Sequence, residues 1–197
     1  DVFREKKLKQ IPIDGPLGWS VPGCVDGWFE LHGRFGELPM SKILDAPIRY
    51  SEEGFPVSEI IANGWRGAKK ALKKWPDSSA TYLPGGNAPA VGEIFKNPRL
   101  AASYRAIASE GRDVFYKGNI AKQIVAFSEA NGGFFGLKDF ADHTSTWVEP
   151  VTTNYRGYDV WELPPNGQGI AALEMLNILE GYDVKAMGQG SAEYLHL

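Results

Sequence analysis

The sequence predicts an α+β fold that is mainly helical and has one late β-hairpin, and three observations indicate this class. Apolar residues recur at helical spacing in several segments before residue 140. Two short runs rich in valine, threonine, tyrosine and tryptophan follow at 147–155 and 158–163, which is typical of paired strands. The strands come after the helices instead of alternating with them, and alternation would predict a parallel sheet.

Residues 1–140 are expected to form a helical region. Residues 1–20 lack helical periodicity and are expected to be extended, and helices follow wherever apolar residues recur every three or four positions. Pro47 is badly placed for a helix interior because it has no amide hydrogen, so a break is expected near it. Residues 76–93 are rich in proline, glycine, serine and asparagine, which predicts the longest loop of the chain, with a short strand at 81–83. The expected helices are 21–36, 59–75, 97–111, 118–133 and 136–143.

The helix at 97–111 has the clearest start signal. Asn97 can cap it through its side chain, and Pro98 occupies the first helical position, where its missing amide hydrogen does no harm. The inward-facing residues are expected to be Leu100, Tyr104 and Ile107 in this helix and Ile120, Ile124 and Phe127 in the next long one.

Residues 141–197 are expected to hold the hairpin, a glycine-rich loop and further helices. Arg156 and Gly157 separate the two strand-like runs, so they are expected to form the hairpin turn. The second strand alternates polar and apolar residues, as a half-exposed antiparallel strand does. The loop leads into a helix at 170–180, and one more helix begins within 191–197.

The glycine-rich loop is the stretch with a recognisable binding pattern. Residues 167–172 satisfy GxGxxG/A, a fingerprint of dinucleotide-binding turns. That interpretation is disfavoured because the fingerprint follows a buried parallel strand through a tight turn, whereas a half-exposed strand and two prolines precede this loop. Two others stay open: backbone N–H groups at the helix start could hold a carboxylate or an oxyanion, or the glycines could simply allow close helix–strand packing. The candidate binding residues are Asn166, Gly167, Gln168 and Gly169.

The remaining polar side chains complete no catalytic set and no metal site, so neither a metal nor another cofactor is expected. The histidines are His32, His143 and His196. They lack the spacing of metal ligands, which favours structural or solvated roles. The hydroxyl residues 144–146 adjoin a histidine only in sequence, and they are interpreted as turn and strand-entry residues. Cys24 is expected to be a small buried hydrophobe rather than a reactive thiol.

Composition and charge exclude some partners. The formal net charge is −3 with acids and bases interspersed, whereas a nucleic-acid binder usually has a basic face. No apolar run approaches the roughly 18 residues that span a bilayer. Neither nucleic acid nor a membrane is therefore an expected partner. The single cysteine and the lack of a visible secretory signal favour the cytoplasm, with the periplasm and the extracellular space left open.

Six stretches, in the same order, resemble one family. They include VPGCVDGWFELHGRFGELP at 21–39, APIRYSEEGFPVS at 46–58, NGGFFGLKDFADH at 131–143 and EPVTTNYRGYDVWELPPNGQGIAALEMLNILEGYD at 149–183; the others are 95–125 and 190–197. Together they cover nearly the whole chain. The family is that of the γ-glutamyltransferases, or glutathione hydrolases, which include acylase-like members.

The resemblance implies a fold and a mechanism that the residues alone do not. Members of the family look like N-terminal-nucleophile hydrolases, with an αββα sandwich made from one precursor that cuts itself into a large and a small subunit. The new N-terminal threonine of the small subunit attacks a γ-glutamyl amide or a related acyl amide. Backbone N–H groups hold the oxyanion, and the acyl group then passes to water or to an amine.

The chain is similar only to the middle and late part of the large subunit. The threonine motif lies downstream of Leu197, and the arginine that binds the substrate carboxylate lies upstream of Asp1, so Arg4 is not that arginine. The resemblance therefore places no catalytic residue in this chain. It implies three partners: a small subunit from the same precursor, a γ-glutamyl or acyl amide substrate, and water or an amine as acceptor. The segment alone is expected to be inactive.

One departure from the family bears on the substrate. Typical members carry PPPSSGG before the late helix, where this chain has PPNGQGI at 164–170. The variant resembles the acylase-like branch, which puts glutathione in doubt as the main substrate. It points to Asn166 and Gln168 as the residues that would set substrate preference. An alternative of another class stays open, in which the segment is a helical scaffold or binding module without chemistry of its own.

Overall fold

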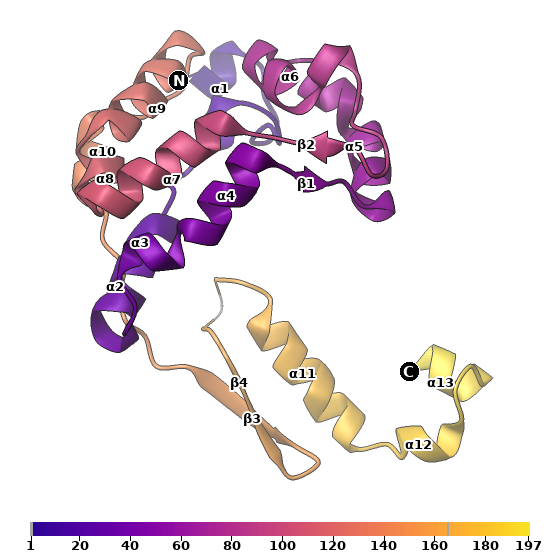
Figure 1. Cartoon of the computed structure of the whole chain (residues 1–197). Helices are drawn as coiled ribbons and strands as arrows, with labels where there is room; N and C mark the ends of the chain where they lie inside the picture. Colours follow the sequence, from indigo (N-terminus) through magenta and orange to yellow (C-terminus); the bar gives the residue numbers. More distant parts are fainter. Residues whose placement is uncertain (1, 165) are drawn as a thin grey trace. The chain divides into compact units, whose positions relative to one another are not determined.

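A computed structural model describes residues 2–164 and 166–197 of the chain, which divides into two compact units, Asp1–Ser145 and Thr146–Leu197 (Figure 1). The first unit is helical apart from one short antiparallel pair of strands. Its elements are α1 (Val2–Glu5), η1 (Pro16–Gly18), α2 (Cys24–Phe35), α3 (Met40–Ile43), α4 (Asp45–Glu53), β1 (Phe55–Pro56), α5 (Glu59–Leu72), α6 (Pro76–Tyr82), η2 (Pro84–Gly86), β2 (Ile94–Phe95), α7 (Pro98–Glu110), α8 (Asp113–Tyr116), α9 (Asn119–Ala130) and α10 (Leu137–Ala141).

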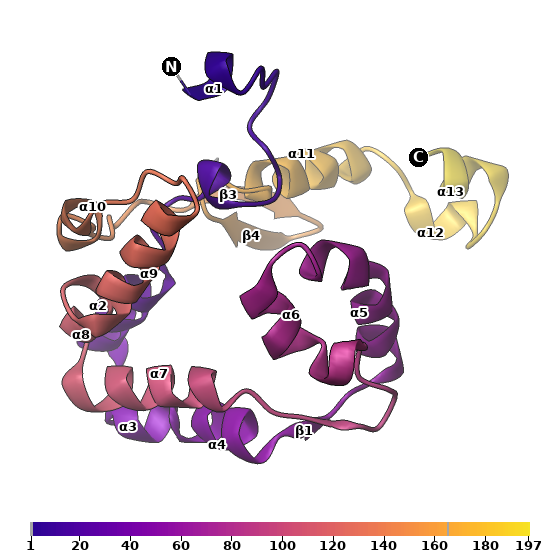
Figure 2. The ribbon, with the colours of Figure 1, turned by 90° about the horizontal axis from the view of Figure 1, so that it is seen from above.

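The main core of the first unit lies where α7 runs alongside α3 and α4 and then leads into α8 and α9 (Figures 1 and 2). Each large apolar side chain buried there stabilises the fold by about 1.5–3 kcal/mol. The fully buried core residues are Val25, Leu44, Ile107, Val114, Tyr116, Ala121, Val125 and Phe140.

A second, smaller core forms where α5 and α6 meet the strand pair. β1 and β2 pair antiparallel, with Phe55 opposite Phe95. The ring centroids of Phe95 and Trp65 are 4.6 Å apart, and Tyr82 stacks on Phe95 at 6.2 Å. Aromatic rings at these spacings attract one another in addition to the apolar area that they bury.

The expected helices are confirmed, and their ends carry the expected signals. Leu100 of α7 was expected to face inward, but it is exposed. The side chain of Asn97 caps α7 by accepting a hydrogen bond from the Leu100 amide at 3.1 Å. The break expected near Pro47 is present, but it falls at Leu44, between α3 and α4. Pro47 itself lies in the first turn of α4, where the amide hydrogen that it lacks would have had no helical partner.

The prediction of a loop at 76–93 is wrong for the first half of that range, and the prediction of a short strand at 81–83 is also wrong. Residues Pro76–Tyr82 form helix α6, with proline at the first helical position. Leu83, directly after the helix, is buried, and Tyr82 packs on Phe95. This packing outweighs the weak helix propensity of the serine, threonine and aspartate residues in the segment.

Three smaller expectations are also corrected. Residues 2–5 form α1 instead of an extended start. Cys24 is the first residue of α2 and is exposed, so it is not a buried hydrophobe; its neighbour Val25 takes the buried position. The fully buried residues of α9 are Ala121, Val125 and Ser128. Those expected to face inward, Ile120, Ile124 and Phe127, lie beside this stripe and are partly buried. Small side chains occupy the buried stripe since they let neighbouring helices approach closely.

The second unit contains the predicted hairpin with a helix packed on it. Its elements are β3 (Val151–Tyr155), β4 (Tyr158–Glu162), α11 (Gly169–Glu180), α12 (Val184–Met187) and α13 (Ala192–His196). The strands are antiparallel, with Thr153 opposite Val160. Partly buried residues alternate along β3 and face α11, where the Thr153 hydroxyl hydrogen bonds to Asn177.

The hairpin turn is fastened to the C-terminal end of α11. Arg156 and Gly157 both have left-handed backbone, with φ of 52° and 85°, as a type I′ turn requires. The guanidinium of Arg156 donates a hydrogen bond to the Tyr182 carbonyl at 2.8 Å, and its backbone amide donates to the Glu180 carboxylate at 3.0 Å. One bond ends on a carbonyl just beyond α11 and the other on the side chain of its last residue, so both hold the turn against the end of the helix.

Over the two described ranges, none of the helices is both long enough and apolar enough to cross a lipid bilayer. The same residues bring no three histidine, cysteine, aspartate or glutamate side chains together as a metal ion would require. The buried charged residue that stands out in the described part of the chain is Asp26, whose side chain is 2% exposed. A buried carboxylate needs partners, because leaving water is costly for a charge.

Candidate functional site

The predicted binding residues lie between β4 and α11 in the second unit. Asn166, Gly167 and Gln168 are exposed, and Gly169 is the partly buried first residue of α11. The Asn166 amide donates a hydrogen bond to the Pro164 carbonyl at 2.8 Å, which tightens the loop. Gln168 precedes the helix, but its side chain does not cap it. The side-chain amides of Asn166 and Gln168 therefore lie on an exposed stretch of this unit, where a ligand could reach them.

The two glycines of this loop differ in their surroundings. A Cβ atom at Gly169 would stand 2.9 Å from Cβ of Glu162, closer than real Cβ contacts, and 3.1 Å from the Leu163 carbonyl oxygen, tighter than most of them. A Cβ at Gly167 would meet nothing within 4 Å, and the backbone there is not left-handed. Close helix–strand packing therefore explains Gly169, whereas no steric requirement explains Gly167.

The start of α11 already has a negative group beside it. Oε2 of Glu162 lies 2.8 Å from the position that a Cβ of Gly169 would take. A carboxylate there compensates the positive end of the helix, and it repels a carboxylate or phosphate approaching from solution. The geometry thus favours packing over anion binding at this helix end. It also excludes a Rossmann turn, because β4 is antiparallel to β3 and the fingerprint follows a parallel strand.

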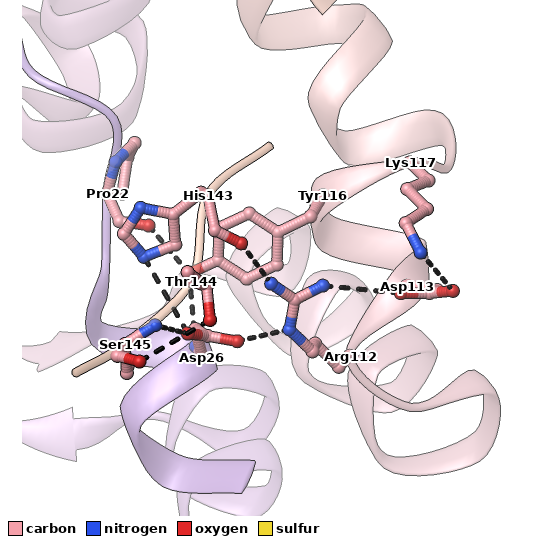
Figure 3. A network of polar contacts seen from close by, with 9 residues as sticks. All are labelled: Pro22, Asp26, Arg112, Asp113, Tyr116, Lys117, His143, Thr144 and Ser145. Carbon is pink, nitrogen blue, oxygen red and sulfur yellow. Dashed lines mark hydrogen bonds and ion pairs between the residues drawn. The ribbon is translucent and has the colours of Figure 1, made fainter. Parts of the chain in front are cut away.

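A buried polar cluster lies in the first unit, at the start of α2 (Figure 3). The carboxylate of Asp26 pairs with Nε of Arg112 and accepts a hydrogen bond from the backbone amide of Ser145. Arg112 also donates from Nη2 to the His143 carbonyl at 2.5 Å. The cluster joins α2, α8 and the segment 143–145, and we call it the polar clamp. Its members are Asp26, Arg112, Tyr116, His143 and Ser145.

Tyr116 connects the parts of the polar clamp. Its hydroxyl donates a hydrogen bond to the Pro22 carbonyl at 2.7 Å and accepts one from the Asp26 amide at 3.0 Å. The guanidinium carbon of Arg112 lies 4.5 Å from the centroid of its ring, and the His143 ring stacks on it at 5.1 Å. Within the described residues, Nε2 of His143 is buried without a hydrogen-bond partner.

Burial and pairing act in opposite directions on the charges of the clamp. Burial raises the pKa of Asp26, but hydrogen bonds from Ser145 and Arg112 outweigh it, so the pKa lies below its ordinary value. Burial likewise lowers the pKa of Arg112, and the hydrogen bond to Asp26 more than offsets this, so the pKa is raised. Both groups are therefore charged at neutral pH. Removing Arg112 would leave the Asp26 carboxylate buried without its cation.

The clamp contains serine, histidine and aspartate, but they are not connected as a catalytic triad. In a triad the histidine accepts the proton of the nucleophile and is oriented by the carboxylate. Here the Ser145 side chain hydrogen bonds to Asp26 itself, and Nε2 of His143 is 3.9 Å from the Asp26 carboxylate (Figure 3). The hydrogen bonds of the clamp join its members to one another and to the neighbouring Pro22 and Asp113, so its chemistry is that of a structural brace.

Asp26, Arg112 and Tyr116 belong to no motif that the sequence reveals. The residues that bind Asp26 lie 86 and 119 positions away, so no local pattern links them. One signal is present, since Asp26 lies within the apolar stripe of α2, three residues before Phe29. An acid in a first helical turn is also favoured by the helix dipole, so the signal does not by itself indicate a buried partner.

Comparison with known proteins shows to which family the chain belongs. The sequence profile described as gamma-glutamyltranspeptidase matches residues 1–197. The chain is 37% identical over its full length to the glutathione hydrolase-like YwrD proenzyme of Bacillus subtilis, and 36% identical over 94% of its length to the acylase ACY 1 proenzyme of Pseudomonas sp. strain SE83. The crystal structure of cephalosporin acylase from Bacillus halodurans covers 99% of this chain with 38% identity and a TM-score of 0.86, and 37% of that chain is matched.

The relatives named above are proenzymes of the hydrolase and acylase type, and the fold of the chain is similar to that of the cephalosporin acylase. The chain belongs to the gamma-glutamyltranspeptidase family. The resemblance read from the sequence is thereby confirmed. The chain spans 37% and 33% of the length of the two relatives named above, about a third in each case.

Proposed function

We propose that the chain is part of the large subunit of a self-processing enzyme that cleaves γ-glutamyl or related acyl amides. The observation that carries this proposal is the family match over all 197 residues, together with relatives that are named as proenzymes. The nucleophile would be the N-terminal threonine of the small subunit, outside this chain, with its own α-amino group as base. The acyl group would pass to water or to an amine.

In this proposal residues 1–140 form a helical region of the large subunit, and residues 141–197 join an αββα core. The hairpin supports this role because it has only two strands, so the outer edge of each can pair with further strands. Trp161 on β4 and Met175 on α11 are large apolar side chains exposed in the second unit. Further layers of a sandwich would cover them.

The glycine-rich loop is proposed to border the acyl group of the substrate. The side chains of Asn166 and Gln168 are exposed, and they lie in the stretch where this chain departs from the typical PPPSSGG loop. Since Glu162 compensates the start of α11, recognition would come from these neutral amides rather than from the helix end. The similarity to an acylase and to a cephalosporin acylase supports an acyl donor other than glutathione.

Experiments on the complete precursor test the proposal. Purified precursor should split into two chains, and the smaller chain should begin with threonine. Replacing that threonine by alanine should abolish both the split and the release of aniline from γ-glutamyl and acyl anilides. A precursor that stays intact, or a small chain that begins with another residue, would contradict the proposal. The 197-residue segment alone should release no aniline.

A further inference from the structure

An apolar groove lies in the first unit between α2 and the segment that contains α3. Its cavity volume is about 490 Å³. One wall carries Trp28, Leu31 and Phe35 of α2, at the helical spacing i, i+3 and i+7, which aligns them on one face. Met40 and Ile43 stand on the opposite wall. The groove therefore has the form of a cleft between two helical walls.

The groove residues are unusually exposed for apolar side chains. Phe35 is 66% exposed, Leu31 54% and Ile43 45%, whereas Val25 on the inner face of α2 is 5% exposed. Leu38, in the turn that joins the two walls, is also exposed. Scattered apolar residues on a surface need no explanation, but a contiguous apolar groove of this kind marks an interaction surface.

The walls restrict what can occupy the groove. Both are helical and not extended, so neither offers a strand edge with which an incoming strand could pair. At one end, Nε2 of His32 is bound to the Leu38 carbonyl at 2.6 Å, so these two polar groups also have partners. An occupant must satisfy its own backbone and offer an apolar stripe, which an amphipathic helix does.

The length of the relatives indicates where this helix comes from. The chain spans 37% and 33% of two relatives, so roughly two thirds of a comparable precursor lies outside it. A permanently attached partner fits the groove best, because permanent interfaces are more apolar than transient ones. We propose that an amphipathic helix from the part of the precursor outside this chain packs in the groove. The inference rests on the precursor organisation of the proposed function, but not on its amide chemistry.

Thiol labelling of the complete protein tests this. In a background without other reactive cysteines, including Cys24→Ser, the variant Leu31→Cys should be labelled about a hundredfold more slowly in the native protein than in denaturant, because labelling then requires local opening. The matched control is Glu30→Cys, which is exposed on the same helix and does not line the groove. Labelling of Leu31→Cys as fast as the control would overturn the proposal.

A photo-crosslinking residue at position 35 identifies the occupant. Cross-links within one molecule to a peptide outside residues 1–197 support the proposal. Cross-links to a second copy, or only to peptides within 1–197, overturn it. The test is independent of the enzymatic proposal, since splitting and amide cleavage are measured on the same preparation. If the protein cleaves amides but position 31 is labelled rapidly, only this inference is contradicted. If the protein does not split but position 31 is protected from labelling, only the proposed function is contradicted.

Discussion

Arg112 at the start of α8 and Asp26 in the first turn of α2 form a partly buried ion pair across 86 residues of sequence, in which Asp26 is the buried partner. The same two side chains also bind the segment 143–145, through the Ser145 amide and the His143 carbonyl. One carboxylate and one guanidinium therefore hold three distant parts of the first unit together.

Replacing Arg112 by methionine should destabilise the protein by about 3 kcal/mol, the lower end of the range for broken buried pairs, because the Asp26 carboxylate would stay buried without its cation. The Ser145 amide would still donate to it, which limits the loss. Urea unfolding of the complete protein measures the change. The control is Lys138→Met, which removes an exposed pair with Asp142 and should leave stability unchanged. Equal losses in the two variants would contradict a structural role for the clamp.

The stability contributed by Asp26 should depend on pH in a defined direction. Its pKa in the folded protein is below the unfolded value of 3.8, so the folded state binds its proton less readily. The contribution is therefore fully present above the unfolded pKa and is lost as pH falls through the folded pKa. Unfolding free energies of the wild type and of Asp26→Asn should differ by a constant amount near neutral pH and converge in acid below the unfolded pKa. A difference that grows on acidification would show that the sign is wrong.

The two loop glycines should respond differently to alanine. Gly169→Ala should cost about 1–3 kcal/mol, because the new methyl group meets Glu162 and the Leu163 carbonyl. Gly167→Ala should be neutral, or stabilising by about 0.4–1 kcal/mol, because its surroundings are open and its backbone suits alanine. Thermal or urea unfolding of both variants measures these changes in stability. Similar costs at both positions would mean that the loop is packed more tightly than its geometry indicates.

Replacing Asn166 and Gln168 together by alanine should change substrate preference without changing stability, since both residues are exposed. In the complete enzyme, the ratio of kcat/KM for an acyl anilide to that for a γ-glutamyl anilide should change about tenfold, which corresponds to roughly 1.4 kcal/mol of differential binding in the transition state. Lys185→Ala on α12 is the surface control and should leave the ratio unchanged. An unaltered ratio in the double variant would leave the loop with its packing role alone.

Features that depend on neighbours in sequence could be predicted. The cap at Asn97 involves residues three apart, and the turn at Arg156 and Gly157 is defined by its two central residues. By contrast, α6 has weak local helix signals, and its burial against Phe95 depends on a residue beyond the following loop. β1 and β2 have two residues each, too few for any periodicity.

In the candidate site, too, local features could be predicted from the sequence and features that depend on distant residues could not. The glycine loop was visible because its pattern is local, and the antiparallel character of the strand before it was visible in the alternation of polar and apolar residues. The carboxylate of Glu162 beside Gly169 was not, because it depends on how the end of β4 meets α11. The polar clamp was missed for the same reason, since each of its bonds spans tens of residues.

The polar clamp limits how far the first unit can be trimmed. Its last two members, His143 and Ser145, lie beyond α10, after every helix of that unit has ended. A polypeptide cut directly after α10 would keep all ten α-helices of the described unit, yet Arg112 would lose a carbonyl acceptor and Asp26 an amide donor. We therefore expect a stable version of this unit to extend through Ser145, four residues past the end of α10.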